Sequence, residues 1–82
     1  MIFRVRHVSG PRGNLVDVVV VVRGEPLTAS QIAPACAWLA ARLSVGTGEV
    51  HGVGAALFPP NRIILSVPRE HAARAAALTE PD

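Results

Sequence analysis

Apolar and polar residues alternate at the start of the chain and then give way to a run of valines. Over residues 2–8, Phe3 and Val5 fall on one side of an extended strand, and the arginines between and after them fall on the other. Residues 9–14 are rich in turn formers, and residues 15–23 contain five consecutive valines. Because β-branched residues pack well in a pleated sheet and are stiff in a helix, the pattern predicts a hairpin of two strands.

The segment after this hairpin has the spacing of an amphipathic helix. Its apolar residues recur at helical intervals, at Ile32, Cys36, Leu39, Ala40 and Leu43. Thr28 and Gln31 have the spacing of an N-terminal capping box, and the helix should end near Ser44 because glycines follow closely. Pro34 leaves two alternatives, an irregular first turn or a regular helix that begins at this proline.

The rest of the chain predicts a second hairpin and a second helix. Residues 49–58 form a weaker strand that two glycines interrupt, and residues 63–67 form a short apolar strand. Pro68 is expected at the first position of a helix that includes residues 72–78. Residues 79–82 are expected to form a frayed tail.

The element order is therefore strand, strand, helix, strand, strand, helix, within one domain of residues 1–82. The simplest packing is a two-layer α+β sandwich, in which a four-stranded, mainly antiparallel sheet carries both helices on one face. A split sheet with the hairpins in another order is the main alternative. Half of the residues are hydrophobic but only 4% are aromatic, so the core should consist of aliphatic side chains and alanine.

The glycine-rich segment 46–54 does not have the features of a nucleotide-binding loop. Its third glycine is one place late, and it follows a helix and enters a strand, which is the reverse of the order that places backbone amides around a phosphate. Nothing in the sequence positions of Glu49 and Glu70, or of Asp17 and Glu25, brings either pair together for acid–base chemistry. No cofactor is predicted.

The histidines and the single cysteine also fail to mark a site. His7, His51 and His71 are far apart and lack the short spacing of metal ligands, so no metal site is predicted. Cys36 lies on the apolar stripe of its helix, where a thiol behaves as a small hydrophobic group and is inert. We therefore expect no catalytic residue.

Charge and hydropathy narrow the possible partners and compartments. Eight arginines and no lysine stand against six acidic residues, and a formal net charge of +2 is too weak to indicate nucleic acid or an anionic membrane. No apolar run is long enough to span a bilayer, and the single cysteine fits a reducing compartment, so we expect a cytoplasmic protein that binds no membrane. The absence of lysine, with abundant alanine and valine, indicates a GC-rich coding sequence of the kind found in high-GC bacteria and their phages.

The valine run predicts apolar side chains on both faces of its strand. If alternate valines face the helices, the opposite sheet face displays further valines surrounded by arginines, which resembles an interface core with a charged rim. The predicted interface consists of Arg4, Arg6, Val19, Val21, Arg23, Trp38 and Ile64. Two other interpretations of the valines remain: either the strand is simply central in the sheet, or its register is shifted so that the faces exchange. Trp38 is either an interface anchor or a residue that covers the edge of the core.

Three classes of function remain, and we rank them by the support that the sequence gives to each. The first is a non-enzymatic interaction or regulatory module that self-associates, or docks on a protein, through this sheet face. The second is a nucleic-acid accessory protein that uses surface arginines, although the chain offers few aromatic residues for base stacking. An enzyme ranks last, because the chain shows no phosphate-binding loop, paired carboxylates, metal-ligand spacing or reactive cysteine. Only a catalytic site assembled between subunits would leave no such pattern in the sequence.

Overall fold

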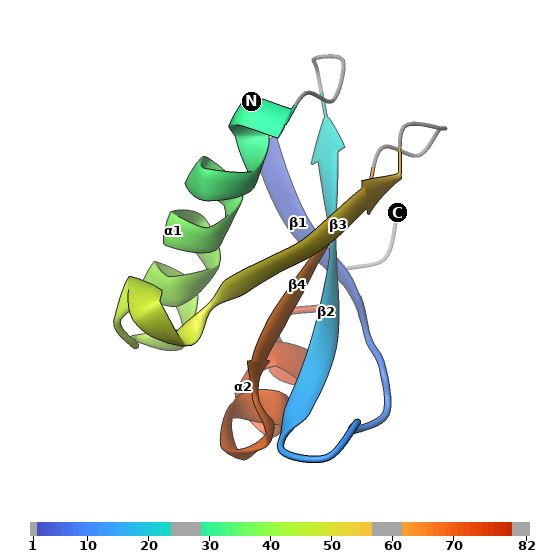
Figure 1. The fold of residues 1–82 in the computed structure, drawn as a ribbon, viewed down its shortest axis with the longest axis vertical. Helices are drawn as coiled ribbons and strands as arrows, with labels where there is room; N and C mark the ends of the chain where they lie inside the picture. Colours follow the sequence, from blue (N-terminus) through green and yellow to red (C-terminus); the bar gives the residue numbers. More distant parts are fainter. Residues whose placement is uncertain (1, 24–28, 57–61, 80–82) are drawn as a thin grey trace.

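The computed structural model describes residues 2–23, 29–56 and 62–79, and it contains the predicted four-stranded sheet (Figure 1). The strands are β1 (Ile2–Val8), β2 (Leu15–Arg23), β3 (His51–Ala56) and β4 (Arg62–Pro68). Their order across the sheet is β1-β2-β4-β3, and every neighbouring pair is antiparallel. The hairpins therefore lie side by side, joined through β2 and β4, and the alternative split arrangement is wrong.

Two α-helices and three short 3-10 turns complete the described part of the chain. The helices are α1 (Ile32–Leu43) and α2 (Ala72–Ala77), and the turns are η1 (Ala29–Gln31), η2 (Thr47–Glu49) and η3 (Arg69–His71). Both helices lie on the same face of the sheet, because their buried side chains belong to one apolar cluster with side chains from β1, β2 and β4. The predicted two-layer α+β architecture is thus confirmed.

The core is aliphatic, as the composition predicts. Alternate residues of the central strands point into it and are fully buried, as are the inner residues of α1: Val16, Val18, Val20, Ile63, Leu65, Val67, Ala35, Leu39, Ala40 and Leu43. β2 therefore has the expected register, and the interpretation with exchanged faces is wrong. The sheet turns one row of valines inward and leaves the other row on the face without helices.

The helix ends follow local chemistry that the sequence indicates only in part. Pro34 is the third residue of α1, where its missing N–H is among those that have no partner within the helix, and the irregular turn η1 precedes it. At the other end Ser44 adopts the left-handed conformation, with φ of 58°, and its N–H bonds back to α1. The expected capping residue Thr28 lies outside the described residues.

The C-terminal elements differ from the prediction around Pro68. Pro68 ends β4 instead of opening a helix, and η3 comes before α2. Thr79 forms a parallel bridge with Val5, and its hydroxyl donates to the carbonyl of Ala76. Thr79 is therefore attached to the sheet edge, whereas residues 80–82 lie outside the described residues.

Each edge strand contains a β-bulge. In β1 the register shifts between Val5 and His7, so that Arg6 is the extra residue. Strict alternation would turn His7 inward and Val8 outward; the bulge reverses this, and Val8 packs on the core. The second bulge falls between Gly52 and Gly54 of β3.

Gly52 allows α1 to pack closely against β3. A Cβ atom at Gly52 would lie 2.6 Å from Cγ2 of Ile32, whereas one at Gly54 would meet nothing within 4 Å. The glycines of this segment therefore serve helix packing and a bulged strand, as expected from a helix stop that leads into a strand.

Candidate interaction surface

The sheet face opposite the helices, called here the open face, has three central rows of side chains across the strands, and a fourth pair, Leu15 and Pro68, follows the third row at the end of β2 and β4. The first row is Arg4, Val21 and Arg62, the second is His7, Val19 and Ile64, and the third is Asp17, Ser66 and His51. In the first row Val21 lies between Arg4 and Arg62. In the third row Asp17 supplies a carboxylate. The face is thus apolar along its middle, basic at one end and acidic to polar at the other.

The apolar part of the open face is narrower than the sequence predicts. Val21, although no helix covers it, is only 4% exposed, while Val19 and Ile64 are half-buried. Val19 and Ile64 are direct cross-strand partners, so their side chains form one continuous patch at the centre of β2 and β4. The accessible apolar centre therefore consists of Val19 and Ile64, and Leu15, which is 40% exposed, adds an apolar side chain beyond the third row.

The bulge in β1 shapes the basic end of the open face. A hollow of about 370 Å³ is lined by Arg6, His7, Val19 and Arg62. In regular alternation Arg6 and His7 would point to opposite faces, but here both border this hollow, because a bulge turns consecutive side chains to one side. The structure thus brings together Arg4, Arg6, Val19, Val21 and Ile64 of the predicted set; the side chain of Arg23 lies outside the described residues.

The acidic row carries an ion pair with the hairpin turn. Arg12 Nη2 lies 2.8 Å from Asp17 Oδ1, and the Arg12 side chain is largely exposed. Because exposed pairs of this kind contribute little to stability, the pair orients the carboxylate without contributing much to the free energy of unfolding.

The sheet edges are less suited to pairing with another chain than the open face. Both edge strands are bulged, and the described part of β1 is bridged by Thr79 along its outer side. Bulges and covered edges are the usual means by which proteins prevent strand-to-strand association. Val53, the extra residue of the β3 bulge, is 53% exposed, but it is the only exposed large hydrophobic side chain among the described residues of that strand.

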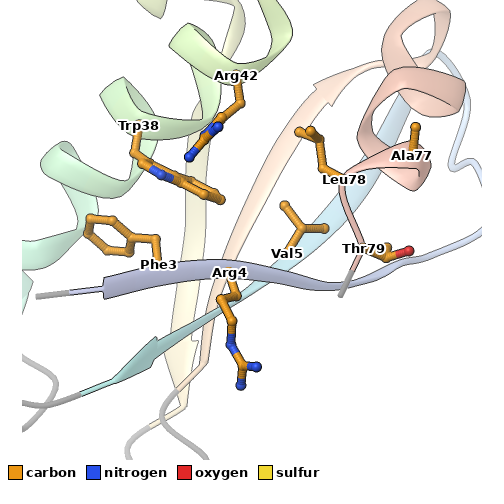
Figure 2. A pocket seen from close by; sticks show the side chains of 8 residues that line it. All are labelled: Phe3, Arg4, Val5, Trp38, Arg42, Ala77, Leu78 and Thr79. Atoms are coloured by element: carbon orange, nitrogen blue, oxygen red, sulfur yellow. The ribbon is translucent and has the colours of Figure 1, made fainter. Parts of the chain in front are cut away.

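Trp38 does not belong to the open face. It lies between α1 and β1, with its ring centroid 5.7 Å from that of Phe3 and with the Arg42 guanidinium 5.7 Å above the ring (Figure 2). Together with Leu78 these side chains border a groove of about 190 Å³ on the helical side of the sheet, and Arg4 points away from it through the opposite face. Trp38 thus covers the edge of the core, and the structure does not unite it with the other predicted interface residues.

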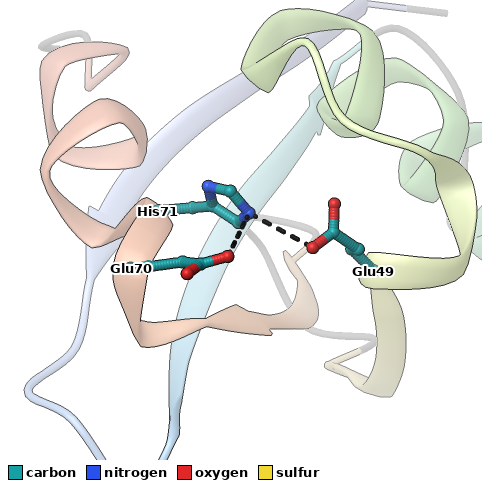
Figure 3. A group of neighbouring side chains, drawn as sticks. All are labelled: Glu49, Glu70 and His71. Carbon is teal, nitrogen blue, oxygen red and sulfur yellow. Dashed lines mark hydrogen bonds and ion pairs between the residues drawn. The ribbon is translucent and has the colours of Figure 1, made fainter.

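A cluster that the sequence does not predict joins the two helical regions. His71 Nε2 lies 3.4 Å from Glu49 Oε1 and 3.5 Å from Glu70 Oε1 (Figure 3). Glu49 belongs to η2 and the other two residues to η3, so only the tertiary fold brings the carboxylates together. The sequence signals this cluster only through the consecutive residues Glu70 and His71, and such a dipeptide is too common to indicate a site.

Cys36 is half-buried on α1 beside the core. Burial raises the pKa of the Cys36 thiol above its ordinary value. The thiolate is therefore scarce at neutral pH, which agrees with an inert role for this residue.

Comparisons with known proteins add no relatives to this picture. No protein-family model, curated protein or solved structure matches the chain. Among the residues described, no helix is sufficiently long and apolar to cross a membrane.

Proposed function

We propose that the protein is a small non-enzymatic interaction module that self-associates through the open face of its sheet. The observation that carries the proposal is the pair Val19 and Ile64, which occupy the centre of the two central strands on the side away from both helices. A central position with apolar side chains and a charged surround is the usual anatomy of a protein–protein interface. We place the protein in the cytoplasm, where its single thiol would remain reduced.

The charges of the three rows select one arrangement of two copies. A two-fold axis that runs across the strands at Val19 and Ile64 places the first row of one copy over the third row of the other. Arg62 then lies over Ser66 of the second copy, one strand away from the carboxylate of Asp17 that Arg12 also contacts, and the apolar centres stack on each other. An axis along the strands would instead oppose arginine with arginine, which is unfavourable.

Sedimentation velocity over a dilution series tests self-association directly. We expect the wild-type protein to form a dimer that dissociates on dilution into the low micromolar range. The double variant Val19→Thr/Ile64→Thr retains β-branched residues on both strands but should weaken the dimer at least about tenfold, since each change removes apolar area twice per dimer. Val53→Thr, on the β3 edge, is the matched control and should associate like wild type.

A monomer at every concentration would overturn self-association. Weakening by Val53→Thr but not by the double variant would place the contact at the sheet edge and would overturn the open face as the interface.

A charge reversal tests the orientation of the two copies. Arg62→Glu alone should weaken the dimer, because it opposes two carboxylates, and Asp17→Arg in the same chain should restore it. If the two copies instead pack with their basic rows together, Asp17→Arg should not restore the dimer that Arg62→Glu weakens.

Nucleic-acid binding through arginine is the second candidate, and the structure gives it one supporting observation. Arg6, His7 and Arg62 border one hollow, which could receive a phosphate group. Against it, Phe3 and Trp38 lie on the helical side, so the described part of the open face offers no Phe, Tyr or Trp for base stacking. A mobility shift that weakens with added salt and is lost in Arg62→Ala would favour this candidate.

A further inference from the structure

The side chains of Glu49, Glu70 and His71 converge on one point between the helical regions. One donor atom from each residue can be chosen so that all three lie within 4.8 Å of one another. Figure 3 shows both carboxylates directed at the same imidazole nitrogen, Nε2 of His71. This point lies between η2 and η3 and involves none of the open-face residues.

The fold holds the imidazole more firmly than the carboxylates. The His71 side chain is only 14% exposed, whereas those of Glu49 and Glu70 are 43% and 73% exposed. Beside the cluster, Arg74 of α2 donates a hydrogen bond to the carbonyl of Leu43, the last residue of α1, which ties the two helical regions together. The cluster therefore combines a fixed nitrogen ligand with two adjustable oxygen ligands that water can reach.

His71 Nε2 and Glu49 Oε1 are within hydrogen-bonding distance, and the separations in the cluster are also compatible with a shared cation. Both carboxylate oxygens nevertheless lie beyond the usual N–H···O range of about 2.7–3.2 Å from a nitrogen that carries at most one proton. Around a tetrahedral Zn²⁺ with ligands at about 2.0–2.1 Å, neighbouring donor atoms are about 3.3–3.4 Å apart. The two observed separations, 3.4 and 3.5 Å, are close to that value.

The donor set and its charge indicate the class of ion. Two carboxylates and a neutral imidazole balance a divalent cation, and an imidazole ligand favours first-row transition metals over Mg²⁺ or Ca²⁺, which prefer oxygen. We propose that Glu49, Glu70 and His71 bind a divalent transition-metal ion such as Zn²⁺, with water completing the coordination. The ion would clamp η2 to η3 and thereby fix α1 relative to α2.

Titration calorimetry of the tag-free protein with ZnCl₂ tests the site. We expect one ion per chain, and His71→Ala should weaken binding at least about 100-fold, since loss of even an outer-shell partner costs about 10–100-fold. Glu70→Gln, at an exposed position where folding is not at risk, should weaken it at least about tenfold. His51→Ala removes an exposed histidine outside the cluster and should bind Zn²⁺ like wild type.

Thermal unfolding provides a second readout. At one fixed Zn²⁺ concentration, the melting temperature of the wild-type protein and of His51→Ala should rise clearly, and that of His71→Ala and Glu70→Gln should rise less or not at all. Absence of Zn²⁺ binding to the wild type, or binding that survives both cluster variants, would overturn the proposal. So would equal binding of MgCl₂, because the imidazole would then not be a ligand.

Discussion

The two faces of the sheet share the same strands but differ in what holds them. On the covered face, alternate residues of β2 and β4 are fully buried against α1 and α2 in one aliphatic cluster. On the open face, the residues between them include Val19 and Ile64, which remain half-buried, within a surround of arginines and one aspartate. One row of the valine run thus builds the core of the domain, whereas the next row faces away from the helices, with Val21 buried and Val19 half-buried.

Leu65 and Ile64 are neighbours on β4 that face opposite sides, so alanine at each position compares the two faces directly. Leu65→Ala leaves a cavity in the core and should lower the free energy of unfolding by about 2–5 kcal/mol. Ile64→Ala should cost clearly less in dilute, monomeric protein, and its main effect should be on association. Urea denaturation at low protein concentration measures both, and equal costs would show that the open face is as important to the monomer as the core.

Alanine substitutions at Gly52 and Gly54 compare a position on β3 that packs against α1 with one that meets open space, and each adds a single methyl group. Gly52→Ala drives a Cβ atom into Ile32 of α1 and should destabilise the fold by about 1–3 kcal/mol. Gly54→Ala meets open space and should change stability by less than about 1 kcal/mol, in the stabilising direction if the unfolded chain loses entropy. Thermal unfolding of the two variants side by side gives the difference, and a Gly54 effect as large as that of Gly52 would contradict the packing described for α1.

Cys36 reports how well the covered side is shielded. Its alkylation should be slow at neutral pH and should accelerate with a midpoint above the ordinary thiol value of about 8.5, because burial raises its pKa. A cysteine introduced by Val53→Cys in a Cys36→Ala background, at an exposed position, provides the matched comparison and should react faster at every pH.

The same shift has a consequence for stability. The folded state holds the Cys36 proton more tightly than the unfolded state, so stability should fall as pH rises past the pKa of the unfolded thiol. Cys36→Ala should remove this part of the pH dependence in alkaline denaturation curves. An unchanged slope would show that the thiol is as solvated in the folded protein as in the unfolded chain.

Local patterns predict most of the fold but only part of the candidate surface. The valine run, the helical stripe that includes Leu39 and Leu43, and the turn residues specify the elements, because each depends on neighbours in sequence. Alternation also places Val19 and Ile64 on one face. It does not reveal that Val21 is already buried there, since the burial of a side chain on a sheet depends on its cross-strand neighbours, Arg4 and Arg62.

Other features follow from tertiary packing and are absent from any local pattern. The bulge at Arg6 turns His7 outward against the expected alternation, and it is set by the pairing of β1 with β2. The convergence of Glu49 with His71 depends on where two separate 3-10 turns end. Trp38 lies at helical spacing on the edge of its stripe, which leaves open whether it covers the core or binds a partner, and only its contact with Phe3 decides between them.

A dilution series monitored by ¹H–¹⁵N NMR tests most directly whether the open face is the interface. Concentration-dependent shifts are expected in the amides of β2 and β4 around Val19, Ile64 and Ser66, and these shifts should disappear in Val19→Thr/Ile64→Thr. Shifts confined to the groove beside Trp38, shifts along the β3 edge at Val53, or no shifts at any concentration would contradict self-association through the open face.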